Sequence, residues 1–143
     1  MTLHLIKLCV GADSIADLAD WQKARLKERK AKGQARELIH ITRHMPKRAE
    51  ELLDGGSLYW VIKGQVAARQ KLLDLRTTKY KGTTHCALVY HPDLILVRPR
   101  AHRPFQGWRY LPGDDAPPDL AKIKGAGKLP QALQTELAEL GLL

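Results

Sequence analysis

The stretch Ser57–Leu75, SLYWVIKGQVAARQKLLDL, decides the fold class. Its first part, Leu58–Ile62, is an unbroken run of β-branched, aromatic and long apolar residues. Such a run predicts a strand that is buried on both faces. Lys63–Gln65 interrupts the run, and Gly64 can supply the positive φ that a tight turn needs. A second strand is predicted over Val66–Leu73, so the stretch indicates a central β-hairpin.

The second strand of this hairpin divides into an apolar and a charged face. Strand alternation places Val66, Ala68 and Leu72 on one face, and Arg69 and Lys71 on the other. We therefore expect the hairpin to be mainly scaffold, with a few charged residues that project outward.

The remaining segments show strand and helix patterns on both sides of this hairpin. Ser14, followed by Asp17 three residues later, resembles a capping box and predicts a helix that begins at Ile15 and ends at Gly33. Apolar spacing puts Ile15, Leu18 and Trp21 on one face of that helix. Further helices are predicted from Pro46 to Leu53 and from Pro130 onward, and further strands over residues 3–10, 38–43, 84–90, 94–97 and 108–111.

These elements predict an α+β protein. Hairpins close in sequence favour a mixed or antiparallel sheet, curled into a partly open β-barrel with about three packed helices. A doubly wound parallel fold is disfavoured, because residues 63–110 leave no room for helices between the strands. We expect one domain over residues 1–143, with residues 77–83 as a polar loop and residues 112–129 as a Pro- and Gly-rich surface segment before the C-terminal helix.

The net charge, the cysteine content and the lack of long apolar runs limit the kinds of partner and cellular location that we expect. The chain has 143 residues, 24 Lys and Arg against 15 Asp and Glu, and a formal charge of +9. Such a charge attracts polyanions but carries no information about the fold. The two cysteines, Cys9 and Cys86, lie in apolar runs, which predicts buried free thiols in a reducing cytoplasm. Neither a signal peptide nor a membrane-spanning run is present, so we expect a cytoplasmic protein without membrane attachment.

The stretch that most resembles a binding site is Arg98–Tyr110, RPRAHRPFQGWRY, called here the arginine segment. It contains four arginines and no acid, with Phe105, Trp108 and Tyr110 interleaved. Arginine presents a planar fork to phosphate, and aromatic rings offer faces to unpaired bases. The alternative is that the aromatic residues fill a barrel core above a basic rim. The lysine-rich run 23–32 is open to two interpretations as well: a solvated helix end or a phosphate-contacting arm.

Metal and catalytic chemistry are not supported by the motifs. His40 and His44 are four residues apart, but on a strand that spacing separates them by roughly 13 Å. The chain has no H-E-x-x-H, C-x-x-C, G-x-S-x-G, Walker or G-x-G-x-x-G motif. We therefore predict no metal, no cofactor and no catalytic residue.

Several short motifs carry a family resemblance. With YWVIKG at 59–64, ARQ at 68–70 and FQGWRYL at 105–111, the chain resembles a family of uncharacterised bacterial proteins, a domain of unknown function best represented in alphaproteobacteria. This resemblance implies a bacterial cytoplasmic protein and no known activity. The order of elements, with a basic aromatic rim, also resembles the PUA and ASCH superfamily of RNA-associated β-barrels.

Together these observations predict a non-enzymatic module that binds nucleic acid, RNA in particular. Its expected contact residues are Lys63, Arg69, Gln70, Arg98, Arg100, Arg103, Gln106, Trp108 and Arg109. The hairpin residues among them matter only if the arginine segment folds alongside the hairpin. One alternative is a small enzyme or sensor that binds a nucleotide-like anion in the barrel mouth through Lys63, Gln70 and Gln106. Another is a protein-interaction module, which would show a contiguous exposed apolar patch.

Overall fold

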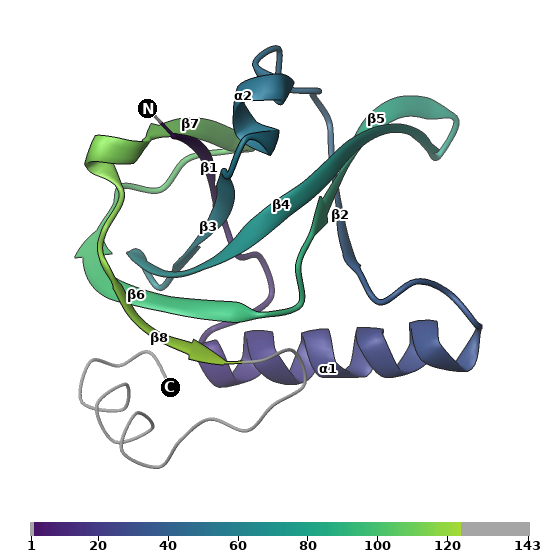
Figure 1. The fold of residues 1–143 in the computed structure, drawn as a ribbon, viewed down its shortest axis with the longest axis horizontal. Helices are drawn as coiled ribbons and strands as arrows, with labels where there is room; N and C mark the ends of the chain where they lie inside the picture. The colour runs from purple at the N-terminus through teal and green to yellow at the C-terminus, as the bar shows by residue number, and fades with distance from the viewer. Residues whose placement is uncertain (1, 124–143) are drawn as a thin grey trace.

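Eight strands and two α-helices are present in residues 2–123, the part of the chain that the computed structural model describes (Figure 1). In chain order they are β1 Leu3–Leu8, α1 Ile15–Ala31, β2 Leu38–Thr42, α2 Ala49–Leu53, β3 Ser57–Ile62, β4 Gln65–Tyr80, β5 Thr83–Tyr90, β6 Leu94–Ala101, β7 Trp108–Pro112 and β8 Asp119–Ile123, with a 3-10 turn at Gly113–Asp115. The predicted α+β class is confirmed. The sheet is mixed, because β1 and β3 are parallel and the other paired strands are antiparallel.

The 16-residue strand β4 is the central strand of an open eight-stranded sheet and pairs with β3, β5 and β6. The main path runs β2-β5-β4-β3-β1-β7, and β6 and β8 continue from β4 as a branch. Because β5 pairs with residues 72–80 of β4 and β6 with residues 65–69, β5 and β6 follow one another along the same edge of β4. Strand β3 occupies the opposite edge, so both halves of β4 are held in the sheet.

The two hairpins of β4 turn through the same dipeptide. Lys63-Gly64 joins β3 to β4 with φ of 49° and 74°, and Lys81-Gly82 joins β4 to β5 with φ of 50° and 77°. Positive φ at both central residues is the type I′ geometry that matches the twist of a hairpin. The first turn was predicted. A polar loop or turn was expected over residues 77–83, but only Lys81-Gly82 is a turn, because Thr77–Tyr80 extend β4 and Thr83 begins β5, so that the two strands form a long ribbon.

Strand β3 is buried on both faces, as predicted. Leu58, Trp60 and Ile62 belong to the larger apolar cluster, whereas Tyr59 and Val61 belong to a second cluster on the other side of the sheet. Val66 also packs in the second cluster, so the predicted common face of Val66, Ala68 and Leu72 is wrong. The reason is the register shifts between Trp60 and Val61 and between Val66 and Ala68, which interrupt the alternation.

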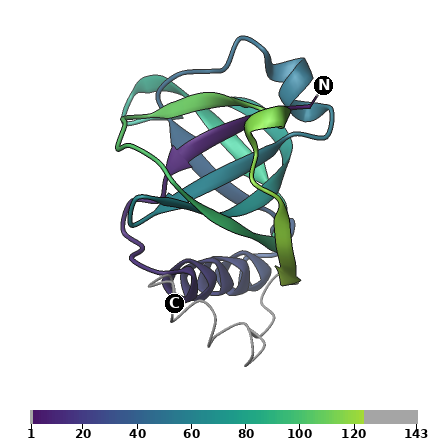
Figure 2. The ribbon, with the colours of Figure 1, turned by 90° about the vertical axis from the view of Figure 1, so that its left-hand side faces the viewer.

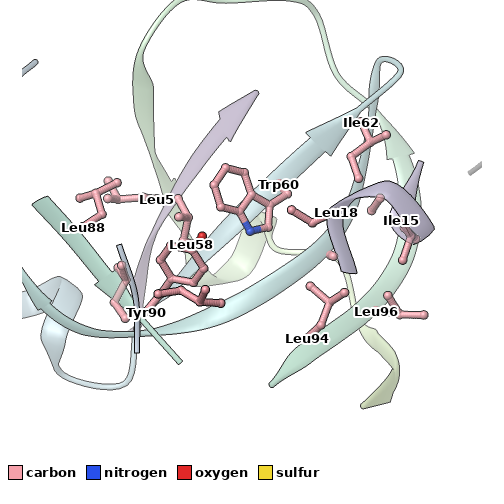
Figure 3. Packing of buried hydrophobic residues seen from close by; sticks show 14 of the residues in the cluster. Leu5, Ile15, Leu18, Leu58, Trp60, Ile62, Leu88, Tyr90, Leu94 and Leu96 are labelled. Carbon is pink, nitrogen blue, oxygen red and sulfur yellow. The ribbon is translucent and has the colours of Figure 1, made fainter. Parts of the chain in front are cut away.

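Helix α1 lies below the strands and covers one end of the larger cluster (Figure 2). Ser14 caps it by accepting a hydrogen bond from the Asp17 backbone N–H at 3.0 Å, which confirms the predicted start. Ile15 and Leu18 reach into the cluster beside Trp60 (Figure 3). Trp21 was expected on the same face but is 43% exposed, because the buried position of the next turn is occupied by Gln22.

Several element boundaries in the structure differ from the predicted ones. Strand β6 continues through Arg98 and Pro99 to Ala101, and α2 begins at Ala49 instead of Pro46. Strand β7 is followed by a further strand, β8, which lies within the segment 112–129 that was expected to be irregular and pairs with β6. The helix predicted from Pro130 lies outside the described residues.

The two ends of the sheet path, β2 and β7, approach each other without pairing as strands in the described part of the chain; this gap is called here the seam. Side chains of β7 contact the segment that follows β2: the Trp108 indole N–H donates to the His44 carbonyl oxygen at 2.9 Å, and the Arg48 backbone N–H donates to the Tyr110 hydroxyl at 3.1 Å. Strand β7 is therefore joined to that segment by individual hydrogen bonds, which leaves room for a groove at the seam.

Candidate nucleic-acid interface

The arginine segment comprises the end of β6, the connecting loop and the start of β7. Strand β6 pairs with β4 so that Arg100 lies opposite Val66, and the His102 backbone N–H donates to the Gly64 carbonyl oxygen at 2.8 Å. The exposed Lys63 turn therefore lies beside the arginine segment. The hairpin residues were expected to matter only if the arginine segment folded alongside the hairpin, and the pairing of β6 with β4 meets this condition at the Lys63 turn.

Three arginines of this segment are exposed and have no ion-pair partner among residues 2–123: Arg98, Arg100 and Arg103. The exposed Arg109 differs, because its guanidinium donates to the carbonyl oxygens of Gln106 at 2.9 Å and Trp108 at 3.1 Å and lies 5.4 Å from the Phe105 ring centroid. Gln106 is exposed and contributes its carbonyl to this contact. Arg109 is thus held by contacts within its own segment, whereas the other three have no ion pair in the described part of the chain.

The aromatic residues of the segment are partly buried. Phe105 packs against the second cluster, and Trp108 and Tyr110 pack against the larger one, with their rings edge to face at 4.9 Å. The structure thus places these three rings at the margins of the two cores, and the Trp108 N–H is already used at the seam.

Arg69 does not belong to the free set. Its guanidinium forms two hydrogen bonds with the Asp119 carboxylate, at 2.8 and 2.7 Å, and a third with the Ser57 hydroxyl at 2.7 Å. The Arg69 side chain lowers the pKa of Asp119, and Asp119 raises that of Arg69. His4 completes this group, called here the Arg69 cluster: its Nδ1 accepts the Ser57 backbone N–H at 2.9 Å, and burial lowers its pKa. Arg69 therefore fastens β8 to the sheet.

Gln70 is fully buried and lies inside the larger cluster. Its side chain exchanges two hydrogen bonds of 2.7 Å with Gln22 of α1, accepts the Trp60 indole N–H at 2.9 Å and donates to the His91 carbonyl oxygen at 3.1 Å. These contacts join helix, sheet and the β5–β6 connection. The structure therefore does not bring Gln70 together with Lys63 and Gln106, and the three cannot line one pocket.

A groove of about 460 Å³ lies at the seam and was not predicted. It is lined by Lys7, Ile41, Thr42, Arg43, Tyr80, His85 and Gly107. Through Gly107 it borders the arginine segment. The signal in the sequence was the acid-free stretch TTKYKGTTH at 77–85, but Lys7 and Arg43 join it only through tertiary structure.

A smaller hollow of about 190 Å³ separates α1 from the sheet. Cys9, Trp21, His40 and Trp60 contribute to its lining, and the pocket is mostly apolar. Both cysteines are free thiols, and burial raises the pKa of Cys9 to about 11, so this thiol is not a ready nucleophile. The hollow is below the roughly 300 Å³ at which ligand pockets typically begin.

A hollow of about 710 Å³ lies beside the lysine-rich end of α1 and is lined by Lys23, Leu26, Lys27, Lys30, Gly33, Gln34 and Arg36. Large exposed apolar residues are distributed over several elements: Val10, Trp21, Met45, Leu53, Leu73, Tyr80 and Leu120. The lysine-rich end of α1 points away from β7 and the end of β6, which lie on the opposite side of the molecule (Figure 1). Within residues 2–123, no three His, Cys, Asp or Glu side chains gather as metal ligands, and neither helix is long and apolar enough to span a membrane.

Comparison with known proteins identifies a family. Residues 5–143 match the family described as "Protein of unknown function (DUF1489)", so the chain belongs to that family. No curated protein and no solved structure matches the chain.

Proposed function

We propose that this DUF1489 protein binds single-stranded nucleic acid, RNA in particular, through the arginine segment and Lys63, and that it catalyses no reaction. The observation that supports the proposal is the contrast among exposed cations: Arg98, Arg100 and Arg103 have no described acid partner, although the chain pairs other arginines closely. We further propose that the open sheet is a PUA-like, partly open barrel, and that the protein acts in the bacterial cytoplasm.

The chemistry of the segment suits a flexible phosphate backbone. Exposed guanidinium groups can reorient toward successive phosphates, and binding releases the counterions that those phosphates had condensed. Pro99 and Pro104 stiffen the segment, which reduces the entropy lost when the arginines are ordered by a ligand. The Arg109 guanidinium over Phe105 adds a planar cationic surface on which a base can stack.

A titration of fluorescent single-stranded RNA at two salt concentrations tests the proposal. We expect log K to fall with log salt by about 0.7 per phosphate contacted. The variant Arg98→Gln/Arg100→Gln/Arg103→Gln should weaken binding at least about tenfold and make it less dependent on salt. A DNA oligonucleotide of the same sequence reports whether the 2′-hydroxyl contributes.

A charge-matched control separates this surface from the net charge of the protein. The variant Lys23→Gln/Lys27→Gln/Lys30→Gln removes the same three charges from exposed positions of α1. It should retain most of the affinity. Absence of binding at low salt, or an equal loss in both variants, would contradict the proposed site.

A further inference from the structure

The seam groove is a second cationic site, separate from the exposed arginines. We propose that it binds a nucleoside monophosphate, with the phosphate held by Lys7 and Arg43 and the base placed against Tyr80. This inference goes beyond the proposed function, because it concerns a phosphate monoester and requires none of the unpaired arginines.

Lys7 is the lining residue best suited to attract an anion into the groove. It is half-buried and has no ion pair among residues 2–123, whereas ion pairs hold other cations of the chain. Burial lowers the pKa of Lys7, and both burial and the charge of Lys7 lower the pKa of His40, to about 4. A desolvated cation without a partner costs free energy, and a bound anion would recover it. Lys7 is therefore better suited to receive an anion than to stabilise the free protein.

The charged side chains that line the groove are both positive. Lys7, Arg43 and His85 come from three strands or strand ends, and no carboxylate lines the groove. A dianionic phosphate can accept hydrogen bonds from an ammonium and a guanidinium at once. An internal phosphodiester carries one charge only, so the cluster of cations favours the monoester.

Tyr80 supplies the contact for a base. Its side chain is 48% exposed, the His85 ring packs edge-on against it at 5.5 Å, and the Lys81 ammonium lies 5.5 Å from its ring centroid. These contacts hold the ring on the tip of the β4–β5 ribbon while leaving surface for stacking. The groove has a volume of about 460 Å³ and is open to solvent.

Two sources share this chemistry: a free nucleotide and the phosphorylated end of a nucleic-acid strand. Both present a phosphate monoester next to a base. Calorimetric titration with AMP, adenosine and inorganic phosphate tests the shared chemistry, and RNA oligonucleotides with a 5′-phosphate or a 5′-hydroxyl distinguish the sources. A 5′-phosphate preference that Lys7→Met abolishes assigns the strand end. AMP binding without that preference assigns the free nucleotide.

Variants sharpen the test. We expect AMP to bind the wild-type protein and adenosine to bind at least about tenfold more weakly. Lys7→Met keeps the buried stem and should lose AMP affinity at least about tenfold, while Lys27→Met on α1 should change it less than twofold. Tyr80→Leu should weaken AMP but leave inorganic phosphate unchanged. Equal affinity for AMP and adenosine, or full affinity in a folded Lys7→Met protein, would overturn the site.

The two proposals fail separately. The Arg98→Gln/Arg100→Gln/Arg103→Gln variant should bind AMP as the wild-type protein does, and Lys7→Met should retain the salt-dependent affinity for long 5′-hydroxyl RNA. Thermal melting of each variant verifies that it is folded. If the arginine variant lost AMP binding as completely as RNA binding, the groove would not be an independent site.

Discussion

Arg69 and Arg100 lie on neighbouring strands of the same side of the sheet, and their surroundings differ. Both charges act to lower the pKa of Tyr59, against the larger effect of burial, which raises it. Arg69 is held by Asp119 and Ser57, whereas Arg100 has no ion-pair partner in the described chain. A cation whose charge the fold already uses, such as Arg69, is therefore a weaker indication of a binding surface than an exposed cation such as Arg100. The same difference separates the partly buried, ion-paired Arg69 from a rim of exposed arginines, Arg98, Arg100 and Arg103, which have no ion pair among residues 2–123.

The largest effect is expected where a predicted binding residue is in fact interior. Gln70→Leu leaves the Trp60 indole N–H and the Gln22 amide without partners, so it should lower the free energy of unfolding by about 2–4 kcal/mol. Gln106→Leu, on the exposed loop, should change it by less than about 0.5 kcal/mol. Urea denaturation measures both. Similar losses of unfolding free energy in the two variants would show that Gln70 does not stabilise the protein more than Gln106 does.

The next effect is the response to acid. Burial lowers the pKa of His40 to about 4, below an unfolded value near 6.5, so the unfolded chain binds more protons between these limits. Stability should therefore be complete above about pH 6.5 and fall as the pH drops toward 4. Burial lowers the pKa of His4 in the Arg69 cluster as well, which adds to the fall. His40→Phe should flatten the curve in urea denaturation at stepped pH; an unchanged slope would contradict this assignment.

A smaller effect is expected at the Arg69 cluster itself. Arg69→Met and Asp119→Asn should each lower the free energy of unfolding by about 1–2 kcal/mol, because each leaves the other group partly buried without its partner. The double variant should lose less than the sum of the two single losses. A double-mutant cycle in urea measures this coupling, and strict additivity would show that the pair does not act as a unit.

The smallest effect on stability is expected at the rim. Arg100→Gln and Arg103→Gln should each change the free energy of unfolding by less than about 0.5 kcal/mol, since neither side chain has an ion pair in residues 2–123. Urea denaturation next to the RNA titration checks this. If either substitution cost as much as Arg69→Met, that arginine would belong to the structural set.

Sequence reasoning predicted elements that depend on local chemistry. The β3–β4 hairpin, the Ser14 cap and the double burial of β3 follow from residues close in sequence. It failed at the long ribbon of β4 and β5, because the polar Thr and Lys side chains at positions 77–79 are compatible with a strand as well as with a polar loop. It also failed at β8, whose strand depends on pairing with β6.

The candidate site was only partly predictable for a related reason. The exposed arginines of the arginine segment fit the basic face that was predicted, whereas its adjacency to Lys63 had been set only as a condition, which the pairing of β6 with β4 meets. The partners of Arg69 and Gln70 were not, because Asp119 and Gln22 are each about fifty positions away along the chain. Likewise, Lys7, Arg43 and Tyr80 line one groove only in the folded sheet, and the residue pattern of a single segment does not predict that they lie together.

The central position of β4 also has a consequence for the order of folding. Its two-residue turns and the short β5–β6 connection bring β3, β5 and β6 to it by local chain closure, which costs little entropy. Pairing of β1 with β7 joins opposite ends of the described chain and requires a long loop closure. We expect the strands β3, β4, β5 and β6 to pair first and the seam to close last. Ala68→Gly should therefore slow folding, whereas Tyr110→Leu should mainly speed unfolding. Stopped-flow measurements of both rates test this order. The seam that bounds the groove would then be the last part of the protein to form and the first to open.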